Sequence, residues 1–181
     1  MSGTAAPVLE TERLWLRGWQ PSDSEPYAAM AADPEVMRYV GGVLDPVQSW
    51  RQMALFAGHW ALRGYGLWAL ERKEDGALIG RAGLWNPAGW PGLEIGWMLA
   101  RDAWGRGYAT EAARAAMDWA WTVLGSERLI SLIDPQNAAS IRVAERLGQR
   151  RMGSETVRER RVAVFGIEAP PIVSGDTASR D

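Results

Sequence analysis

The chain has 181 residues, 20 basic against 22 acidic side chains, a formal net charge of −2, 47% hydrophobic residues and no cysteine. This length and apolar content suit one globular domain and exclude a disordered chain, because enough apolar surface is present to offset the entropy of ordering. The lack of cysteine excludes disulfide scaffolds and thiolate chemistry, and the single histidine, His59, argues against a histidine metal cluster or a Ser-His-Asp triad.

The apolar stretches are interrupted by Arg, Asp or Gly before they reach the ~18 residues that a membrane helix needs, and the N-terminus carries no secretory pattern. We therefore expect a cytoplasmic protein without a metal or membrane partner. A near-neutral net charge gives no chain-wide attraction for nucleic acid, which is not an expected partner. The oligomeric state stays open, a homodimer included.

The first half of the chain predicts one strand and then helices. Residues 11–17 alternate in polarity, with Leu14 and Leu16 on one face and Trp15 on the other. Helices are expected from Pro21 to Ala32, briefly after Asp33-Pro34, and from Asp45-Pro46 to about Leu62, where Asp is a good cap and Pro suits the first turn.

The second half alternates strands and helices. Three apolar runs, the first two joined by an Asp-Gly turn at 75–76, predict an antiparallel meander. An amphipathic helix follows, then a strand, a second helix capped by Asn137, and two final strands around an Arg-rich turn. The predicted strands are 66–73, 77–85, 93–99, 129–133, 152–157 and 162–167, and the helices are 108–124 and 138–147.

This order predicts a single α/β domain over residues 8–168, with flexible tails at 1–7 and 169–181. The expected core is a mixed, mostly antiparallel sheet of about six or seven strands, flanked by about four helices. No internal repeat divides the chain.

The densest motif is Trp104-Gly-Arg-Gly-Tyr-Ala-Thr-Glu111, between an expected strand and an expected helix. Gly105 and Gly107 permit a sharp turn close to a ligand, the helix start points unpaired N–H groups at it, and Arg106 adds a positive charge. Alone, such a turn indicates a tight corner as readily as an anion site. The dinucleotide fingerprint is not met, because its third small residue is misplaced.

A second motif, Asn137-Ala-Ala-Ser140, opens the last helix, which ends at Leu147-Gly148. Together with the Gly-x-Gly helix and the opening Glu12-Arg-Leu-Trp-Leu-Arg17, this order resembles the GCN5-related N-acetyltransferase (GNAT) superfamily over about residues 8–168. The likeness is greatest to its ribosomal-protein N-terminal acetyltransferase (RimJ/RimL-like) branch. Such a fold implies a sheet that opens between its fourth and fifth predicted strands.

The resemblance implies acetyl-CoA as acetyl donor. Its pyrophosphate would bind the loop that contains Trp104, Gly105, Arg106, Gly107, Tyr108, Ala109 and Thr110. The pantetheine arm would run along the main chain of Met98 and Leu99, and Asn137 and Ser140 would complete the cofactor site. Family members with a tyrosine acid carry it seven residues after the Asn, where this chain has Ala144.

Acetyl transfer requires a neutral amine, so a carboxylate able to accept a proton is needed. Glu94 is the candidate base because it interrupts an apolar strand, although alternation also allows an exposed face. Glu155 is a weaker alternative base, and Glu111 is interpreted as structural. Ser140, or a water molecule, would protonate the leaving thiolate.

The acceptor is expected to be a primary amine: a protein N-terminus in the branch named above, or an antibiotic, polyamine or amino acid. Five tryptophans near the early helices suggest an aromatic pocket: Trp19, Trp50, Trp60, Trp85 and Trp90. His59 is interpreted as a surface or rim residue, and the Arg-rich segment 142–161 as a solvated face. An acyl-CoA-binding sensor with little activity is the alternative function, and a single-strand nucleic-acid binder is a weaker third.

Overall fold

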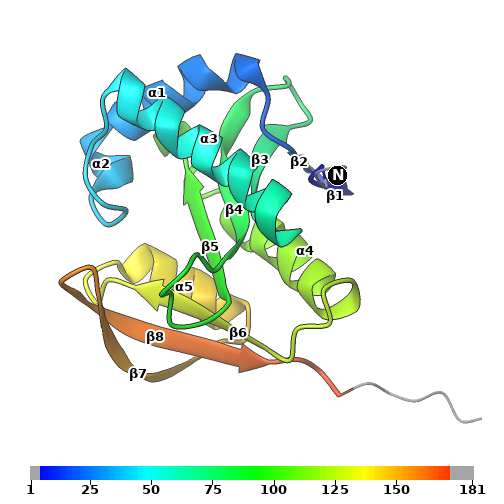
Figure 1. Ribbon diagram of the computed structural model, residues 1–181, viewed down its shortest axis with the longest axis vertical. Coiled ribbons are helices and arrows are strands. Elements are labelled where there is room, and N and C mark those ends of the chain that lie inside the picture. The colour runs from blue at the N-terminus through cyan, green and yellow to red at the C-terminus, as the bar shows by residue number, and fades with distance from the viewer. Residues whose placement is uncertain (1–4, 172–181) are drawn as a thin grey trace, which may run out of the picture.

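The computed structural model describes residues 5–171, which form one eight-stranded sheet with helices on both faces (Figure 1). The strands are β1 (Leu9–Glu10), β2 (Leu14–Arg17), β3 (Leu67–Arg72), β4 (Leu78–Trp85), β5 (Glu94–Leu99), β6 (Arg128–Ile133), β7 (Arg150–Val157) and β8 (Arg160–Glu168). The α-helices are α1 (Ser24–Ala32), α2 (Pro34–Met37), α3 (Pro46–Arg63), α4 (Tyr108–Thr122) and α5 (Ala138–Arg146). Two 3-10 turns, η1 (Pro21–Asp23) and η2 (Arg101–Ala103), precede α1 and α4.

The strands lie in the order β1-β2-β3-β4-β5-β6-β8-β7, and every neighbouring pair is antiparallel except β5 and β6. The mostly antiparallel α/β sheet predicted from the sequence is confirmed. The two-residue strand β1 adds one strand to the expected set, and the single turn α2 accompanies four longer helices.

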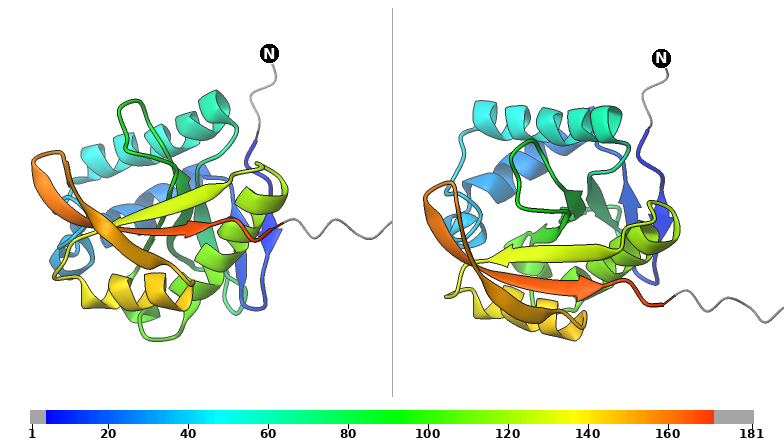
Figure 2. Two further views of the ribbon diagram at one scale, coloured as in Figure 1. Left: turned by 90° about the horizontal axis from the view of Figure 1, so that it is seen from below. Right: turned by 60° about the horizontal axis from the view of Figure 1, so that its bottom comes forward.

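The helices form two layers, with α3 on one side of the sheet and α5 on the other (Figure 2). Helices α1 to α3 contribute Tyr27, Val36 and Phe56 to a core that also contains Leu67 and Met98 of the sheet. The opposite face packs on α4, which buries small side chains: Ala112, Ala113, Ala116 and Ala120. Alanines on α4 allow the helix to lie close to the strands.

Local sequence signals fix where several elements begin and end. Asp45 accepts the backbone N–H of Gln48 at 2.8 Å while Gln48 returns a side-chain contact, which caps α3 as predicted. Gly64 ends that helix with a φ of 73°. The predicted turn between β3 and β4 is confirmed, with Gly76 at a φ of 72°.

Strand β2 shows the predicted alternation, since Leu14 and Leu16 are fully buried and Trp15 is partly exposed. Lys73 lies next to this strand, and its ammonium contacts the Glu10 carboxylate at 2.7 Å and the Thr11 carbonyl oxygen. The same ammonium lies 4.5 Å from the centroid of the Trp15 ring.

The sheet opens between β5 and β6, where only Glu94 and Ile130 are paired in register. Figure 1 shows the two strands diverging from this point. Ser131 holds the base of the opening, because its buried hydroxyl donates to the Ile95 carbonyl at 2.7 Å. The opening that the resemblance implied is therefore present, between the fourth and fifth of the strands predicted from the sequence.

The ends of the expected domain lie near the limits of the described residues. Pro7 contacts the sheet, since its carbonyl accepts the Trp68 indole N–H at 2.8 Å. Most of the expected tail residues, 1–4 and 172–181, lie outside the described part of the chain. Within residues 5–171, the structure contains no helix of the length and apolar character needed to cross a bilayer.

Candidate functional site

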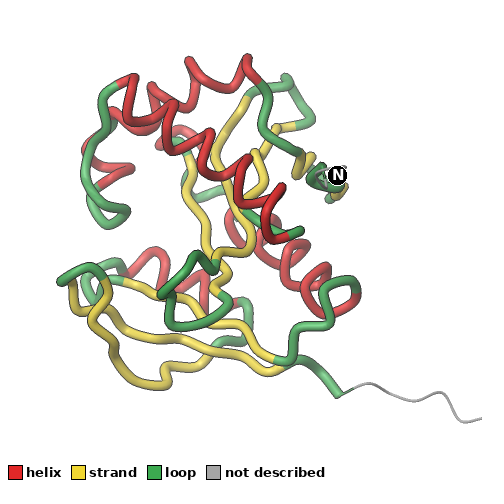
Figure 3. Tube along the Cα trace, in the orientation of Figure 1, coloured by secondary structure: helices red, strands yellow, loops and turns green. Residues whose placement is uncertain are grey.

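A cavity of about 300 Å³ lies at the opening of the sheet. Its walls come from the segment after α2, from α3, from β4 to β6, from the start of α5 and from the β7–β8 turn. Figure 3 shows the long loop between β4 and β5, which contributes Trp90, in green beside these strands. The cavity therefore joins parts of the chain that are far apart in sequence.

Glu94, the first residue of β5, lines this cavity and is partly buried. Its Oε2 accepts the Trp90 indole N–H at 2.7 Å, and its Oε1 accepts the Leu132 backbone N–H at 3.4 Å. Burial raises the pKa of Glu94 from 4.5 to about 7, although the two hydrogen bonds and the nearby charge of Arg81 act in the opposite direction. A carboxyl group with such a pKa exchanges protons near neutral pH.

Asn137 and Ser140 line the same cavity from the start of α5. The Asn137 side-chain oxygen accepts the backbone N–H of Ser140 at 3.1 Å and thereby caps the helix. Within residues 5–171, the Ser140 hydroxyl has no hydrogen-bond partner. The fold thus brings Ser140 and Glu94, which are 46 positions apart, to one cavity.

The predicted glycine loop forms the turn before α4. Gly105 and Gly107 adopt left-handed φ values of 74° and 83°, where a larger residue is strained. Among the described residues, no backbone N–H from Gly105 to Thr110 donates to a protein acceptor. Arg106 is exposed, and the buried Thr110 hydroxyl also lacks a partner. Unpaired N–H groups at the helix start are the chemistry that binds phosphate.

This loop does not line the cavity that holds Glu94 and Ser140. Along the chain, Met98 and Leu99 at the end of β5 lie between the part of this strand that lines the cavity and the glycine loop. Met98 packs with α1 to α3 and Leu99 with the α4 core. The Leu99 carbonyl accepts the Trp104 indole N–H at 2.9 Å, so this oxygen is already bonded within the chain.

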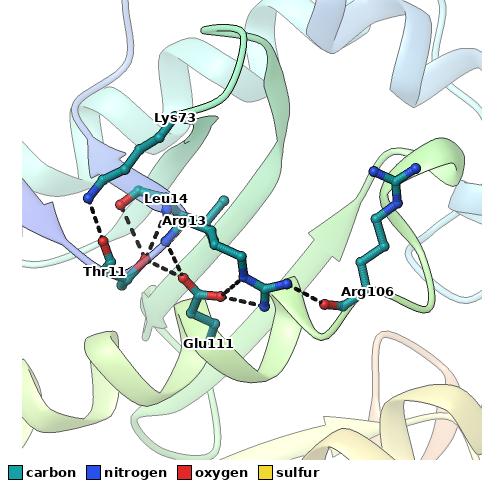
Figure 4. Close-up of polar contacts among 6 residues, drawn as sticks. All are labelled: Thr11, Arg13, Leu14, Lys73, Arg106 and Glu111. Atoms are coloured by element: carbon teal, nitrogen blue, oxygen red, sulfur yellow. Dashed lines mark hydrogen bonds and ion pairs between the residues drawn. The ribbon is translucent and has the colours of Figure 1, made fainter.

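Glu111 has a structural role, as the sequence suggested (Figure 4). Its carboxylate accepts the Thr11 hydroxyl at 2.6 Å and the backbone N–H of Arg13 at 2.8 Å, and it forms an ion pair with the Arg13 guanidinium. These contacts hold the pKa of Glu111 below its usual range, in opposition to burial. Arg13 also donates to the Arg106 carbonyl at 2.9 Å and so supports the glycine loop.

The predicted aromatic pocket is only partly formed by the five tryptophans that suggested it. Trp85 and Trp90 line the cavity, whereas Trp19 and Trp60 belong to the cores and Trp50 is exposed on α3. Tryptophan spacing alone does not reveal which face of a helix meets a cavity.

Sequence reasoning missed several residues that line the cavity, among them Trp97 and Arg81. Arg81 interrupts an apolar strand as Glu94 does, and the same argument applied to β4 would have identified it.

The interpretation of His59 as a surface or rim residue is wrong. Its ring is 6% exposed, stacks on Trp85 at 4.5 Å, and bonds through Nδ1 to the Tyr65 carbonyl. Its position on the sheet-facing side of α3 explains this burial.

Glu155, the alternative base, is exposed and lines a separate hollow beside β6, away from the cavity of Glu94.

Comparison with known proteins identifies the family. The acetyltransferase (GNAT) domain model matches residues 13–150. The chain belongs to the GNAT acetyltransferase family. The uncharacterized protein YkkB of Bacillus subtilis (strain 168) is 37% identical over 163 residues, which cover 86% of this chain and 91% of YkkB. The superfamily predicted from the sequence is confirmed.

Solved structures of GNAT proteins share the architecture described above. The acetyltransferase from Agrobacterium tumefaciens str. C58 is 33% identical, with a TM-score of 0.80 over 91% of this chain and 95% of that one. An aminoglycoside acetyltransferase, AAC(6')-Ib in complex with coenzyme A, has a TM-score of 0.72 over 86% and 94% of the two chains. At 18% identity this second likeness concerns the fold alone. These comparisons support N-acetyltransferase activity for the present GNAT chain.

Proposed function

We propose that this protein is an acetyl-CoA-dependent N-acetyltransferase that acts on a primary amine by direct transfer within a ternary complex. The observation that carries the proposal is the position of Glu94, a carboxyl group with a raised pKa, in the cavity where β5 and β6 separate. The acceptor is a small-molecule amine or a protein N-terminus, and the site of action is the cytoplasm.

The glycine loop fits the phosphates of acetyl-CoA. Six consecutive N–H groups from Gly105 to Thr110 have no protein acceptor in the described chain, and Arg106 adds an exposed guanidinium. The Cβ of a larger residue at Gly107 would approach the Arg13 guanidinium at 3.5 Å in a strained backbone conformation. The phosphates are proposed to bind here, with the pantetheine arm along Met98 and Leu99 and with Asn137 and Ser140 near the thiol end.

Acetyl-CoA would supply the acetyl group as a thioester, and the residues of the cavity would accept and donate the protons of the reaction. Glu94 accepts a proton from the acceptor ammonium at Oε1, which is held less tightly, by the Leu132 N–H at 3.4 Å, than Oε2 is by the Trp90 N–H at 2.7 Å. The neutral amine then attacks the acetyl carbonyl, a C–N bond forms and the C–S bond breaks. The Ser140 hydroxyl donates its proton to the departing sulfur, a role left vacant by the buried Ala144. The second proton lost by the nitrogen restores the Ser140 hydroxyl, and Glu94 returns the first proton to solvent.

A thermal-shift titration with acetyl-CoA tests the donor site. The wild-type protein is expected to gain about 2.7 kcal/mol of stability at a hundredfold excess over the dissociation constant. Gly107→Glu, which places a carboxylate in the loop, should abolish this gain. Gly125→Glu is the matched control, since Gly125 has a similar φ of 67° with no atoms near its Cβ, and it follows the opposite end of α4. A wild-type protein without any shift would contradict the proposal.

Release of free thiol over a panel of amines then separates an enzyme from a binding module. The replacement of the family's tyrosine by Ala144 keeps an acyl-CoA-binding sensor as a second candidate. Turnover with any amine, dependent on Glu94, supports the enzyme. Acetyl-CoA binding without turnover on any amine would support the sensor.

A further inference from the structure

Arg81 is a buried cation without a protein partner. It lies in β4, is 9% exposed, and its Nε is buried without a hydrogen-bond acceptor. Within residues 5–171 its guanidinium forms no ion pair, and its nearest described contact is the face of the Phe56 ring at 4.9 Å. Burial of a charge is costly unless a counter-charge compensates it. Such a group is typical of a binding site that receives an anion.

Arg81 lines the same cavity as Glu94. On β4 it pairs with Met98, whereas Glu94 pairs with Trp85, so both side chains leave the sheet on the face covered by α1 to α3. At about 3.3 Å per residue, four positions separate the two backbone sites by roughly 13 Å along the strands. A long cationic side chain and a carboxylate thus approach one another across a small cavity.

The other charges of the cavity do not neutralise Arg81. Asp134 is already paired with Arg160 at 2.9 Å. Arg158 lies over the Trp90 ring at 5.4 Å and adds a second positive charge. Glu94 is therefore the one acidic cavity residue without an ion-pair partner, within the described residues. A positive cavity repels polyamines and aminoglycosides, which carry several ammonium groups.

The remaining walls are mainly aromatic and aliphatic. They include Leu55, Phe56, Trp85, Trp90 and Trp97. A volume of about 300 Å³ is at the small end of ligand pockets. These walls suit a small molecule with an apolar side chain and few polar groups.

We propose that Arg81 binds the carboxylate of the acceptor while Glu94 receives its amine, so that the acceptor is an α-amino acid with an apolar side chain. This inference rests on the proposed acetyltransferase function and narrows its acceptor. A guanidinium binds a carboxylate through two parallel N–H donors, which fixes its orientation. With the carboxylate held at Arg81, the nitrogen on the adjacent carbon is directed toward Glu94.

The first test compares leucine, methionine, phenylalanine and tryptophan with their carboxamides at saturating acetyl-CoA. Each pair shares the amine and the side chain and differs in the carboxylate. The best acid is expected to exceed its amide in kcat/KM by at least about tenfold. The α-amino group of the amide loses its proton more easily than that of the acid. Intrinsic amine reactivity alone would therefore favour the amide. Equal rates for acid and amide, or turnover of amides alone, would overturn the inference.

The second test changes Arg81. Arg81→Met keeps an apolar contact with Phe56 and should raise KM for the acid at least about tenfold, with little change for the amide. Arg81→Lys keeps the charge but loses the bidentate geometry of the guanidinium. Its KM for the acid should lie between those of Arg81→Met and the wild type. Arg151→Gln removes an exposed arginine outside the cavity and is the matched control. An equal effect of Arg81→Met on acid and amide would contradict the assignment.

A binding measurement keeps the inference separate from the proposed function. Thermal shifts with each amino acid alone require no acetyl transfer, and the wild-type shift should vanish in Arg81→Met but remain in Arg151→Gln. If acetyl-CoA binds and simple amines are acetylated while no amino acid binds or reacts, this inference fails and the proposed function stands. If acetyl-CoA produces no shift, the proposed function fails.

Discussion

Two opposing effects act on the pKa of Glu94 in the cavity. Glu94 is buried enough that its pKa rises to about 7, yet Trp90 and Leu132 donate hydrogen bonds to its two oxygens. The donors stabilise the ionised form and burial stabilises the protonated form. The result is a carboxyl group that is about half ionised at neutral pH, as a general base requires.

Glu94→Gln should lower kcat by roughly a hundredfold or more, because general-base catalysis contributes about that factor. In the wild type, kcat should rise with pH through about 7 as Glu94 ionises. With the same acceptor, the kcat of the variant should not show this rise with pH. Stopped assays of thiol release between about pH 6 and pH 9 provide the measurement.

Stability measurements act as the folding control for this variant. The folded pKa of Glu94 lies above the unfolded one, so the wild type loses stability as pH rises from about 4.5 to about 7. Gln cannot ionise, and the variant should be at least as stable as the wild type at about pH 8. A variant that unfolds more easily there, or one with full activity, would remove Glu94 from the proposed role.

Single residues also show what a sequence reveals about a site. Glu94 was found because a charge within an apolar strand requires an explanation, and Arg81 carries the same signal in β4. His59 was missed because helix spacing locates a side chain on a face without stating what packs against that face. Burial by a distant strand is a property of the tertiary structure.

At the scale of elements, the start of α4 is attached to the edge of the sheet. Thr11 and Arg13 bind Glu111 of α4, and Arg13 also reaches the Arg106 carbonyl in the glycine loop (Figure 4). The sequence predicted the loop, the helix and the structural role of Glu111. It did not predict the partner, because a contact between residues about 100 positions apart depends on how β2 and α4 pack.

Arg13→Met should loosen the glycine loop without changing the cavity. Loss of the hydrogen bond to the Arg106 carbonyl, worth about 0.5 to 1.5 kcal/mol, should weaken acetyl-CoA binding by roughly threefold to tenfold. The acceptor KM should stay unchanged. Isothermal titration with acetyl-CoA measures the effect, and Arg151→Met is the matched control. An acetyl-CoA affinity identical to that of the wild type would show that the loop needs no such support.

At the scale of the whole molecule, the single sheet consists of two halves that meet over a short stretch of β5 and β6. Strands β1 to β5 form one continuous ladder and β6 to β8 another, with one register pair between them. The sequence predicted nearly every strand and helix, since turns and caps are local signals. The opening between β5 and β6 was predicted only from the family resemblance, because the separation of two strands has no local signature in the sequence.

Ser131 links the two halves through the hydrogen bond from its buried hydroxyl to the Ile95 carbonyl. Ser131→Ala should lower the free energy of unfolding by about 1 to 3 kcal/mol, because a buried hydrogen bond is lost. Chemical denaturation measures this change. Hydrogen exchange should locate the increased opening at β5 and β6, and equal protection in wild type and variant would contradict this role.

The contacts of Lys73 have a practical consequence. It is the sole lysine among 20 basic residues, and its ammonium is bound by Glu10 and Thr11 beside the Trp15 ring. Arginine does not react with acylating reagents as lysine does, so a protein that handles activated acetyl groups exposes a single side-chain amine to them. Among the side chains of residues 5–171, an amine-directed fluorophore would accordingly label Lys73, which lies outside the cavity.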